Sequence, residues 1–347
     1  MTPDQLLAGP RGRRLCLSVA ADLDPAVATG VFYAAYELDP GKGVSVVLFG
    51  AAPPDGVGAE APQRLAELMD ALEVPALDEG LIRRALTESV ATAMYWQPPD
   101  GRDVLAALPV IRDALVPVAA RILASPEAAW WQESRAEEQW AINWREPDAP
   151  APLGKNTSSA LSAWARNTRT EENQWRKRGG GPASAWSGSW WSIPTRLLGT
   201  IGRVPGGLDL VEDAPGWLDA TAVGVHGGGK TFEIRTPDDW GQLCRAFPLE
   251  VTASRRNDWF RATGRDGRWF IPDWERAAGE WDAVHLTVQG YLSCAGRVVE
   301  LDGDGASVLA GWDPDRTIWL TDAVPEAAAP RQQWHRNQQG DLWVRTG

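Results

Sequence analysis

Residues 224–231, GVHGGGKT, match the spacing G-x-x-x-x-G-K-[ST], in which glycine amides cradle phosphate and the lysine contacts it. Such a loop needs a strand before the glycines and a helix that begins at the lysine. The residues from Lys230 onward, KTFEIRT, are β-branched and alternate, and Pro237 follows soon after. They predict a strand, so we interpret residues 226–229 as the turn of a β-hairpin rather than as a nucleotide-binding loop.

The clearest electrostatic signal lies in residues 254–268, SRRNDWFRATGRDGR, where five arginines stand against two aspartates in a chain of net charge −12. Arginine forks bind phosphate or carboxylate, and a neighbouring tryptophan can stack on a planar group. We therefore predict a site for a small anionic ligand here, formed by Arg255, Arg256, Trp259 and Arg261. The alternative is a solvated segment whose arginines pair with surface acids.

The histidines and cysteines offer little for nucleophilic or metal chemistry. The chain has three of each, and no two stand at the spacing of metal ligands, so no metal site is predicted. His285 lies in an apolar strand candidate, where a lone histidine is more often structural than catalytic. Cys244 shares the apolar face of a helix with Leu243 and Phe247, so we expect a buried, unreactive thiol. Residues 301–305, LDGDG, are interpreted as a hairpin turn rather than a calcium loop.

Composition restricts the class of protein. The net charge of −12 over 347 residues argues against broad nucleic-acid binding, which relies on lysine and arginine. No apolar run approaches the roughly 18 residues of a membrane span, and the N-terminus lacks the pattern of a secretion signal. Three well-separated cysteines without a C-x-x-C spacing favour a reducing compartment, so we expect a cytoplasmic protein.

Tryptophan is unusually frequent, with 20 Trp against 4 Tyr and 6 Phe. Buried aromatic residues dominate core energetics, so we expect most of these rings in the core. Trp186, Trp190 and Trp191 instead lie in a Gly/Ser-rich loop at 179–192, which is either tucked under a domain or is a mobile flap. In a non-enzymatic interaction protein this loop would be the contact surface. A glycan-binding groove would also use tryptophans, but we identify no carboxylate pair beside them.

The elements that position these residues fall into two halves. Apolar residues recur at helical spacing in three N-terminal stretches, and one short run resembles a strand. The helical stretches are 61–74, 77–96 and 109–125, the last restarting at Pro117, and the strand candidate is 43–51. We therefore expect a mainly helical domain over 1–145, followed by a linker over 146–155 that is rich in proline and charge.

The C-terminal half changes to short strand candidates separated by turn signals, which predicts an α+β domain over 156–322 with a largely antiparallel sheet. A helix is expected to begin at Pro237, with Thr236 as its N-terminal cap. Residues 323–347 look like an appended tail. The fold class expected for the whole chain is α+β.

Three segments resemble uncharacterised conserved proteins of actinobacteria over most of residues 180–322: FEIRTPDDWGQLCRAFPLEVTASRRNDWFRATG, WFIPDWERAAGEWDAVHLTVQGYL and LAGWDPDRTIWL. More loosely, a strand (FEI), an Asp-Trp helix and a later strand with tyrosine (VHLT…GYL) resemble ADP-ribosyltransferase-like domains. Those domains hold NAD in a cleft of a split antiparallel sheet, so the resemblance implies NAD as a candidate cofactor. Their Ser-Thr-Ser strand and [Gln/Glu]-x-Glu loop are missing here, which leaves Glu300 as the late acid.

Two functions stay open. In the first, the C-terminal domain binds an anionic, nucleotide-like ligand, with Arg255 and Arg256 holding phosphate. As an ADP-ribosyl-transfer enzyme it would use His285 and Tyr291 at the ribose or ring, and Glu300 to stabilise positive charge at the sugar carbon. This hypothesis predicts that these five residues are exposed together in one cleft. In the second, the chain is a non-enzymatic interaction protein with the tryptophan-rich loop as its contact surface.

Overall fold

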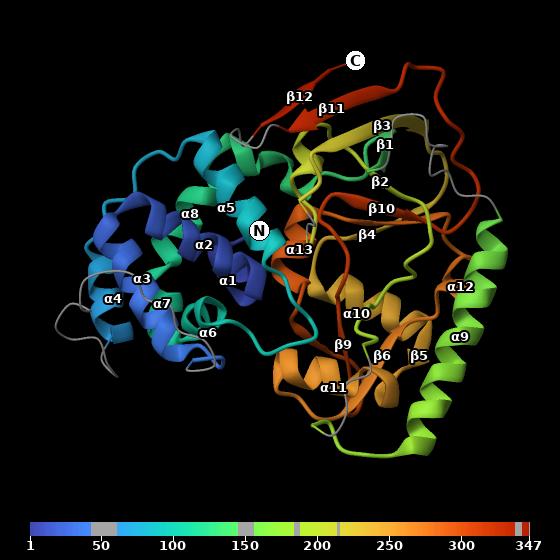
Figure 1. Ribbon diagram of the computed structural model, residues 1–347, viewed down its shortest axis with the longest axis horizontal. Helices are drawn as coiled ribbons and strands as arrows, with labels where there is room; N and C mark the ends of the chain where they lie inside the picture. Colours follow the sequence, from blue (N-terminus) through green and yellow to red (C-terminus); the bar gives the residue numbers. More distant parts are fainter. Residues whose placement is uncertain (43–60, 145–155, 184–187, 214–215, 337–341, 347) are drawn as a thin grey trace.

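The computed structural model describes residues 1–42, 61–144, 156–183, 188–213, 216–336 and 342–346. The protein has an α+β fold, with helices gathered in the N-terminal part and the strands of two sheets mostly in the C-terminal part, as the sequence predicts (Figure 1). The strand candidate at 43–51 and the predicted linker lie outside the described residues. None of the described helices is long and apolar enough to cross a membrane.

The N-terminal helices pack into a bundle around a shared apolar core. They are α1 (Pro3–Ala8), α2 (Pro10–Leu23), α3 (Pro25–Leu38), α4 (Ala61–Asp70), α5 (Glu79–Ala91), α6 (Gly101–Ala107), α7 (Pro109–Ala114) and α8 (Val116–Leu123), followed by the 3₁₀ helix η1 (Pro126–Gln132). Proline at the first helical position starts α1, α2, α3 and α7, where its missing N–H costs nothing. The expected restart near Pro117 is confirmed by the break between α7 and α8.

The larger sheet runs through the C-terminal part. Its order is β12 (Trp343–Arg345), β11 (Gln332–Arg336), β3 (Asp219–His226), β1 (Glu138–Asn143), β2 (Gly199–Ile201), β10 (Arg316–Trp319), β7 (Ala283–Leu286) and β4 (Thr231–Ile234). All its pairings are antiparallel except that of β4 with β7, which confirms the expected sheet type. The 3₁₀ helix η2 (Gly206–Leu208) lies in the connection from β2 to β3.

The GGGKT segment is neither a nucleotide-binding loop nor a hairpin turn. As predicted, a strand, β4, follows Lys230, and the next helix, α10, begins at Pro237 with Thr236 as its cap. The hairpin interpretation is wrong, because β1, β2, β10 and β7 lie between β3 and β4. The connection passes directly over the sheet: a Cβ at Gly227 would lie 2.0 Å from the ring of Trp319, so only glycine fits.

A smaller sheet and several helices complete the C-terminal part. Its order is β5 (Pro248–Glu250), β6 (Arg268–Pro272), β9 (Gly305–Val308) and β8 (Val298–Glu300). The helices are α9 (Thr157–Arg178), α10 (Pro237–Ala246), α11 (Thr252–Thr263), α12 (Trp274–Ala277) and α13 (Val288–Cys294). Strands β8 and β9 pair antiparallel on either side of the LDGDG segment, which confirms it as a hairpin turn.

The halves are joined more closely than the predicted boundaries suggest. Strand β1, from the expected helical domain, lies between β3 and β2, and the expected tail contributes β11 and β12 to the same sheet. Helix α13 packs against α1 and α2 (Figure 1). A Cβ at Gly9, between α1 and α2, would lie 2.0 Å from the carbonyl oxygen of Leu292 in α13, so the close approach of these helices requires glycine.

Tryptophan serves mainly as core material, as expected. Six rings are completely buried: Trp240, Trp259, Trp269, Trp274, Trp312 and Trp319. Several of their N–H groups are hydrogen-bonded, as in the 2.9 Å bond from Trp240 Nε1 to Ser307 Oγ. The neighbouring Cys244 is also buried, as expected, and burial raises the pKa of its thiol to about 12.

Candidate functional site

A cavity of about 460 Å³ opens where the helical bundle meets the smaller sheet. Its lining comes from the start of α2, the segment from Met94 to Leu108, the end of α11, and the turn before β8. Met94, Val104, Leu108 and Val298 give the cavity an apolar wall. The polar lining consists mainly of Arg11, Arg13 and Arg297 against the single carboxylate of Asp103, so the cavity keeps a positive excess in an acidic protein.

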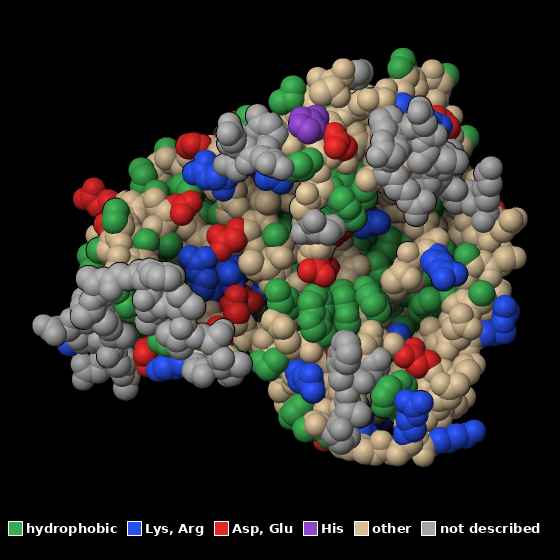
Figure 2. Space-filling view, in the orientation of Figure 1, with side chains coloured by type: hydrophobic (Ala, Val, Ile, Leu, Met, Phe, Trp, Pro, Cys, Tyr) green, Lys and Arg blue, Asp and Glu red, His purple; other side chains and the backbone are tan. Residues whose placement is uncertain are grey.

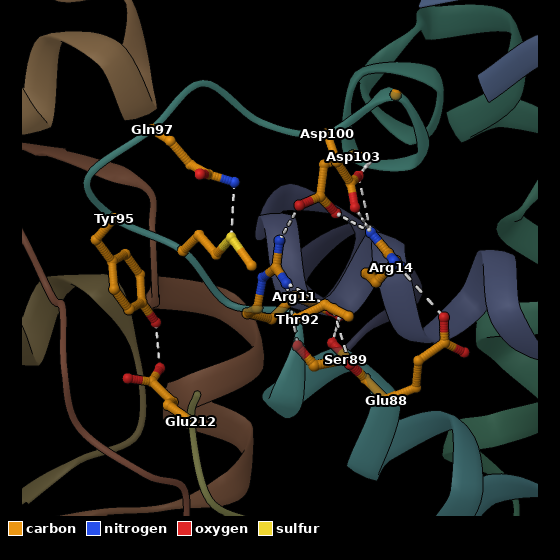
Figure 3. Close-up of polar contacts among 12 residues, drawn as sticks. Arg11, Arg14, Glu88, Ser89, Thr92, Tyr95, Gln97, Asp100, Asp103 and Glu212 are labelled. Atoms are coloured by element: carbon orange, nitrogen blue, oxygen red, sulfur yellow. Dashed lines mark hydrogen bonds and ion pairs between the residues drawn. The ribbon is translucent and has the colours of Figure 1, made fainter. Parts of the chain in front are cut away.

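Arg11 lines the cavity and is almost completely buried. Its side chain is only 5% exposed, and its guanidinium forms an ion pair with Asp103 and donates a 3.0 Å hydrogen bond to the carbonyl of Ser89 (Figure 3). The next turn of α2 adds Arg14, whose Nη1 lies 2.9 Å from Asp100 and 3.3 Å from Asp103 (Figure 3). Asp100 also caps α6 by accepting a bond from the backbone N–H of Asp103. This network fixes α2 against α6.

Arg13 and Arg297 each have guanidinium N–H groups that no described residue accepts a hydrogen bond from. Arg13 Nη1 donates to the carbonyls of Leu7 and Ala8, while its buried Nε has no partner among the described residues. Burial, followed by the nearby positive charge of Arg112, Arg11 and Arg297, lowers the pKa of Arg13 to about 10. The guanidinium of Arg297 makes no hydrogen bond or ion pair with the part of the chain that the structure describes. Such clustered cations favour an anion.

A buried carboxyl group lies directly behind the cavity wall. Tyr95 lines the cavity, and its hydroxyl donates a hydrogen bond to Glu212 Oε1 (Figure 3). The hydroxyl of Tyr291 donates to the same oxygen over 2.9 Å. The other oxygen, Oε2, is buried without a partner among the described residues. Burial, together with the charge of Asp313, raises the pKa of Glu212 to about 8. Glu212 is therefore largely protonated at neutral pH.

The face of the molecule drawn in Figure 2 is hollowed between the helical bundle and the strands. Hydrophobic side chains gather on the floor of this hollow, and Lys or Arg and Asp or Glu side chains lie together on the helical side of it. The junction between the two parts therefore combines apolar surface with clustered charge.

The arginine-rich segment predicted from the sequence is a helix, α11, and its side chains have other partners. Arg255 is buried and pairs with Glu171 at 3.3 Å, and Arg256 bonds to the carbonyl of Gly180. Trp259 is fully buried and donates to the carbonyl of Trp190 over 2.9 Å, so it presents no face to a ligand. Arg261 is exposed. The structure does not place these four residues as one open anion site.

The three predicted catalytic residues also form no shared exposed site. His285 is completely buried on β7, Tyr291 is buried on α13 against Glu212, and Glu300 is exposed at the end of β8, 3.4 Å from Arg265. The prediction that Arg255, Arg256, His285, Tyr291 and Glu300 are exposed together in one cleft is therefore wrong. The physical reason is that His285 and Tyr291 lie on elements whose neighbouring residues are apolar, and such elements are buried in most globular folds.

His285 belongs to a different polar group, on one face of the larger sheet. Thr317, His285 and Glu233 are direct neighbours across β10, β7 and β4, and His285 Nδ1 lies 3.0 Å from Thr317 Oγ1. Its Nε2 lies 3.8 Å from Asp315. Burial, with a contribution from Arg135 and Arg235, lowers the pKa of His285 to about 3, whereas burial raises that of Asp315 to about 7. No group of three or more His, Cys, Asp or Glu residues in the described part of the chain is arranged to hold a metal.

Sequence reasoning missed the arginines of the cavity. The available signal was R-G-R-R at 11–14, which opens an otherwise apolar helix. Nothing near it in the sequence indicates the partners Asp100 and Asp103 or the approach of Arg297, since these residues come from elements far along the chain. Of the predicted residues, only Tyr291 contacts the group behind the cavity, through Glu212.

Comparisons with known proteins complete the description of the site. No protein-family model, no curated protein and no solved structure gives a significant match to the chain. The resemblances to actinobacterial proteins and to ADP-ribosyltransferase-like domains stay predictions.

Proposed function

We propose that the protein binds a small anionic, nucleotide-like ligand in the cavity between its two halves. The observation that carries the proposal is the pair Arg13 and Arg297: both line the cavity, and both keep guanidinium donors without acceptors among the described residues. The buried, unpaired Nε of Arg13 costs free energy, and more because it is charged, so an anion that accepts from it is stabilising. Phosphate and carboxylate have the geometry that arginine forks prefer.

Two further features support a specific site over a general electrostatic attraction. Arg11 also lines the cavity, and its ion pair with Asp103 and its hydrogen bond to Ser89 hold its positive charge in place. The apolar wall of Met94, Val104 and Leu108 offers contact to the uncharged part of a ligand. The proposal is confined to binding, since His285, Tyr291 and Glu300 share no common site for a transfer reaction.

Calorimetric titration of the whole chain tests this proposal. The probes are inorganic phosphate, pyrophosphate, AMP, ADP, NAD and ADP-ribose, with glucose as a neutral comparison. We expect binding of at least one phosphorylated probe and none of glucose. Arg297→Gln should weaken that binding at least about tenfold, as expected for the loss of a charge-assisted hydrogen bond.

Arg166→Gln is the matched control, because Arg166 is an exposed arginine on α9 and does not line the cavity. It should leave binding unchanged. Equal weakening by Arg166→Gln and Arg297→Gln would reduce the effect to overall charge and contradict a site at the cavity. Binding of no anion at all would reject the proposal.

A second candidate function, contact with another protein through tryptophan, is favoured by the exposure of Trp191, whose relative accessibility is 37%. Trp190 beside it is half-buried, and Trp186 lies outside the described residues. Tryptophan is one of the residue types enriched at the hot spots of protein interfaces. If no anion binds, a protein partner captured by the chain and lost on Trp191→Ala would favour this second function.

A further inference from the structure

Apolar side chains line the same cavity as the arginines. On the side of the helical bundle they include Met94, Val104 and Leu108, and on the side of the C-terminal part Ala262 and Val298. All of them belong to one cavity of about 460 Å³, a size typical of sites that hold a whole small molecule. A ligand whose charged group lies at the arginines therefore has its remainder within reach of these side chains.

The neutral polar side chains of the lining are already hydrogen-bonded within the protein. Among the described lining residues they are Tyr95 and Thr263. The hydroxyl of Tyr95 donates to Glu212 (Figure 3), and that of Thr263 donates to the carbonyl of Trp259 over 2.5 Å. Neither hydroxyl proton is free for a ligand.

The carboxylate of Asp103, which also lines the cavity, is engaged as well. Its Oδ2 pairs with Arg11, and its Oδ1 lies 3.3 Å from Nη1 of Arg14. Sugar hydroxyls in this cavity would have to displace existing partners or stay unpaired, and burying an unpaired hydroxyl costs free energy. The lining consequently favours a neutral part that needs no hydrogen bond.

The charges of the lining indicate the kind of anionic group. Among the described lining residues, Arg11, Arg13 and Arg297 against Asp103 leave an excess of two positive charges. A phosphate ester carries about 1.5 to 2 negative charges at pH 7, whereas a carboxylate carries about one. The excess therefore matches a phosphate ester, whose terminal oxygens can accept from more than one arginine.

We infer that the ligand is a phosphate monoester of an apolar alcohol, with its phosphate at Arg13 and Arg297 and its hydrocarbon part against Met94, Val104 and Leu108. The inference rests on the proposed function: it keeps the anionic group and specifies the neutral body attached to it. Such a ligand resembles a nucleotide in carrying phosphate on a larger neutral body. A ribose in that position would face side chains whose hydrogen-bonding groups are already in use, so a hydrocarbon body fits the lining better.

Calorimetric titration of the whole chain with phosphate esters tests the inference. Methyl, propyl and hexyl phosphate differ only in chain length, and propyl phosphate differs from glycerol 3-phosphate only in its missing hydroxyls. We expect the affinity to rise about two- to fourfold for each added methylene that becomes buried. Propyl phosphate should bind at least about fivefold more tightly than glycerol 3-phosphate, because the hydroxyls lose water without gaining a partner.

Met94→Gln locates the hydrocarbon part of the ligand. Met94 lines the cavity and is 42% exposed, so the change replaces an apolar side chain by a polar one of similar size outside the core. It should lower the ratio of hexyl to methyl phosphate affinity at least about threefold. Leu68→Gln is the matched control, since Leu68 on α4 is 43% exposed and does not line the cavity. It should leave that ratio unchanged.

The outcomes separate the two proposals. If glycerol 3-phosphate binds as tightly as propyl phosphate, or AMP more tightly than hexyl phosphate, the anion site stands and the inference about the hydrocarbon body is wrong. If Met94→Gln and Leu68→Gln lower the ratio equally, the hydrocarbon lies outside the cavity and the inference is again overturned. If neither these esters nor inorganic phosphate and pyrophosphate bind, the proposed function itself fails.

Discussion

At the residue scale, the environment of each side chain decided its role more than its chemical type did. Glu212 and Glu300 are both glutamates, yet Glu300 is exposed beside Arg265 while Glu212 is buried under two tyrosine hydroxyls. Burial disfavours the charged form, which raises the pKa of Glu212 to about 8. A sequence pattern carries almost no information about such differences, because the tyrosines come from positions 95 and 291.

Glu212 makes the free energy of unfolding depend on pH. A carboxyl group whose pKa is raised on folding favours the folded state below its unfolded pKa of about 4.5, and that contribution is lost as pH rises toward about 8. Glu212→Gln keeps an oxygen that can accept from both tyrosines but cannot ionise. We expect the variant to be more stable than the natural protein at pH 8.5 by more than about 1.4 kcal/mol, the free energy of one pKa unit.

Urea unfolding at pH 5 and pH 8.5 measures this effect, with Glu300→Gln as the exposed control. The difference between the Glu212 variant and the natural protein should be larger at pH 8.5 than at pH 5, whereas the control should show no such change. A pH-independent difference for Glu212→Gln would mean that the carboxyl group ionises normally in the folded protein.

At the element scale, helices were easier to predict than strand pairing. The periodic stretches around α4, α5, α7 and α8 and the capped start of α10 were confirmed, since helix signals are local. The predicted β3–β4 hairpin was wrong, because each strand found its partner far away in the chain: β3 pairs with β1, and β4 with β7. Residues 254–263 of the arginine-rich segment likewise lie in α11, and Arg268 begins β6.

The contact between α13 and the α1–α2 junction depends on Gly9. We expect Gly9→Ala to lower the free energy of unfolding by about 1–3 kcal/mol, because the added methyl meets the backbone of Leu292, which cannot rotate away. Gly206→Ala is the matched control, since no atom lies within 4 Å of a Cβ built there. Urea unfolding of the two variants checks this, and equal stability of both would mean that the helices are not in close contact.

At the scale of the whole molecule, the candidate site exists only where the two parts meet. The cavity takes Arg11 and Arg13 from α2 and Arg297 from the turn before β8. One apolar core includes Leu6 and Leu15 of the bundle and Leu292 and Trp274 of the C-terminal part. The strand β1 binds the end of the helical half into the larger sheet. The expected division into a helical domain, an α+β domain and a tail understates this continuity.

The shared core and sheet predict that the two parts unfold together. Far-ultraviolet circular dichroism reports mainly on the helices, and tryptophan fluorescence mainly on the C-terminal part, where most of the buried rings lie. We expect the two signals to give the same urea midpoint, which is the test of a cooperative transition. Two separate midpoints would show that the halves are independently stable and that the cavity can be lost while each half stays folded.

The sequence alone determined the properties that depend on composition and on neighbouring residues. It predicted the α+β class, the helices with clear periodicity, the capped start of α10, the buried Cys244 and the core role of most tryptophans. It also predicted that GGGKT is not followed by a helix. Each of these follows from local pattern or from average hydrophobicity, which are properties of short stretches.

Only the tertiary structure decided which residues meet. The partners of Arg255 and Trp259, the burial of His285 and Tyr291, and the meeting of Arg11, Arg13 and Arg297 at one cavity all depend on contacts between distant segments. Such contacts are selected by packing and by pairing of strands across the whole chain, so no single segment encodes them. The candidate site of this protein is for that reason a product of its fold.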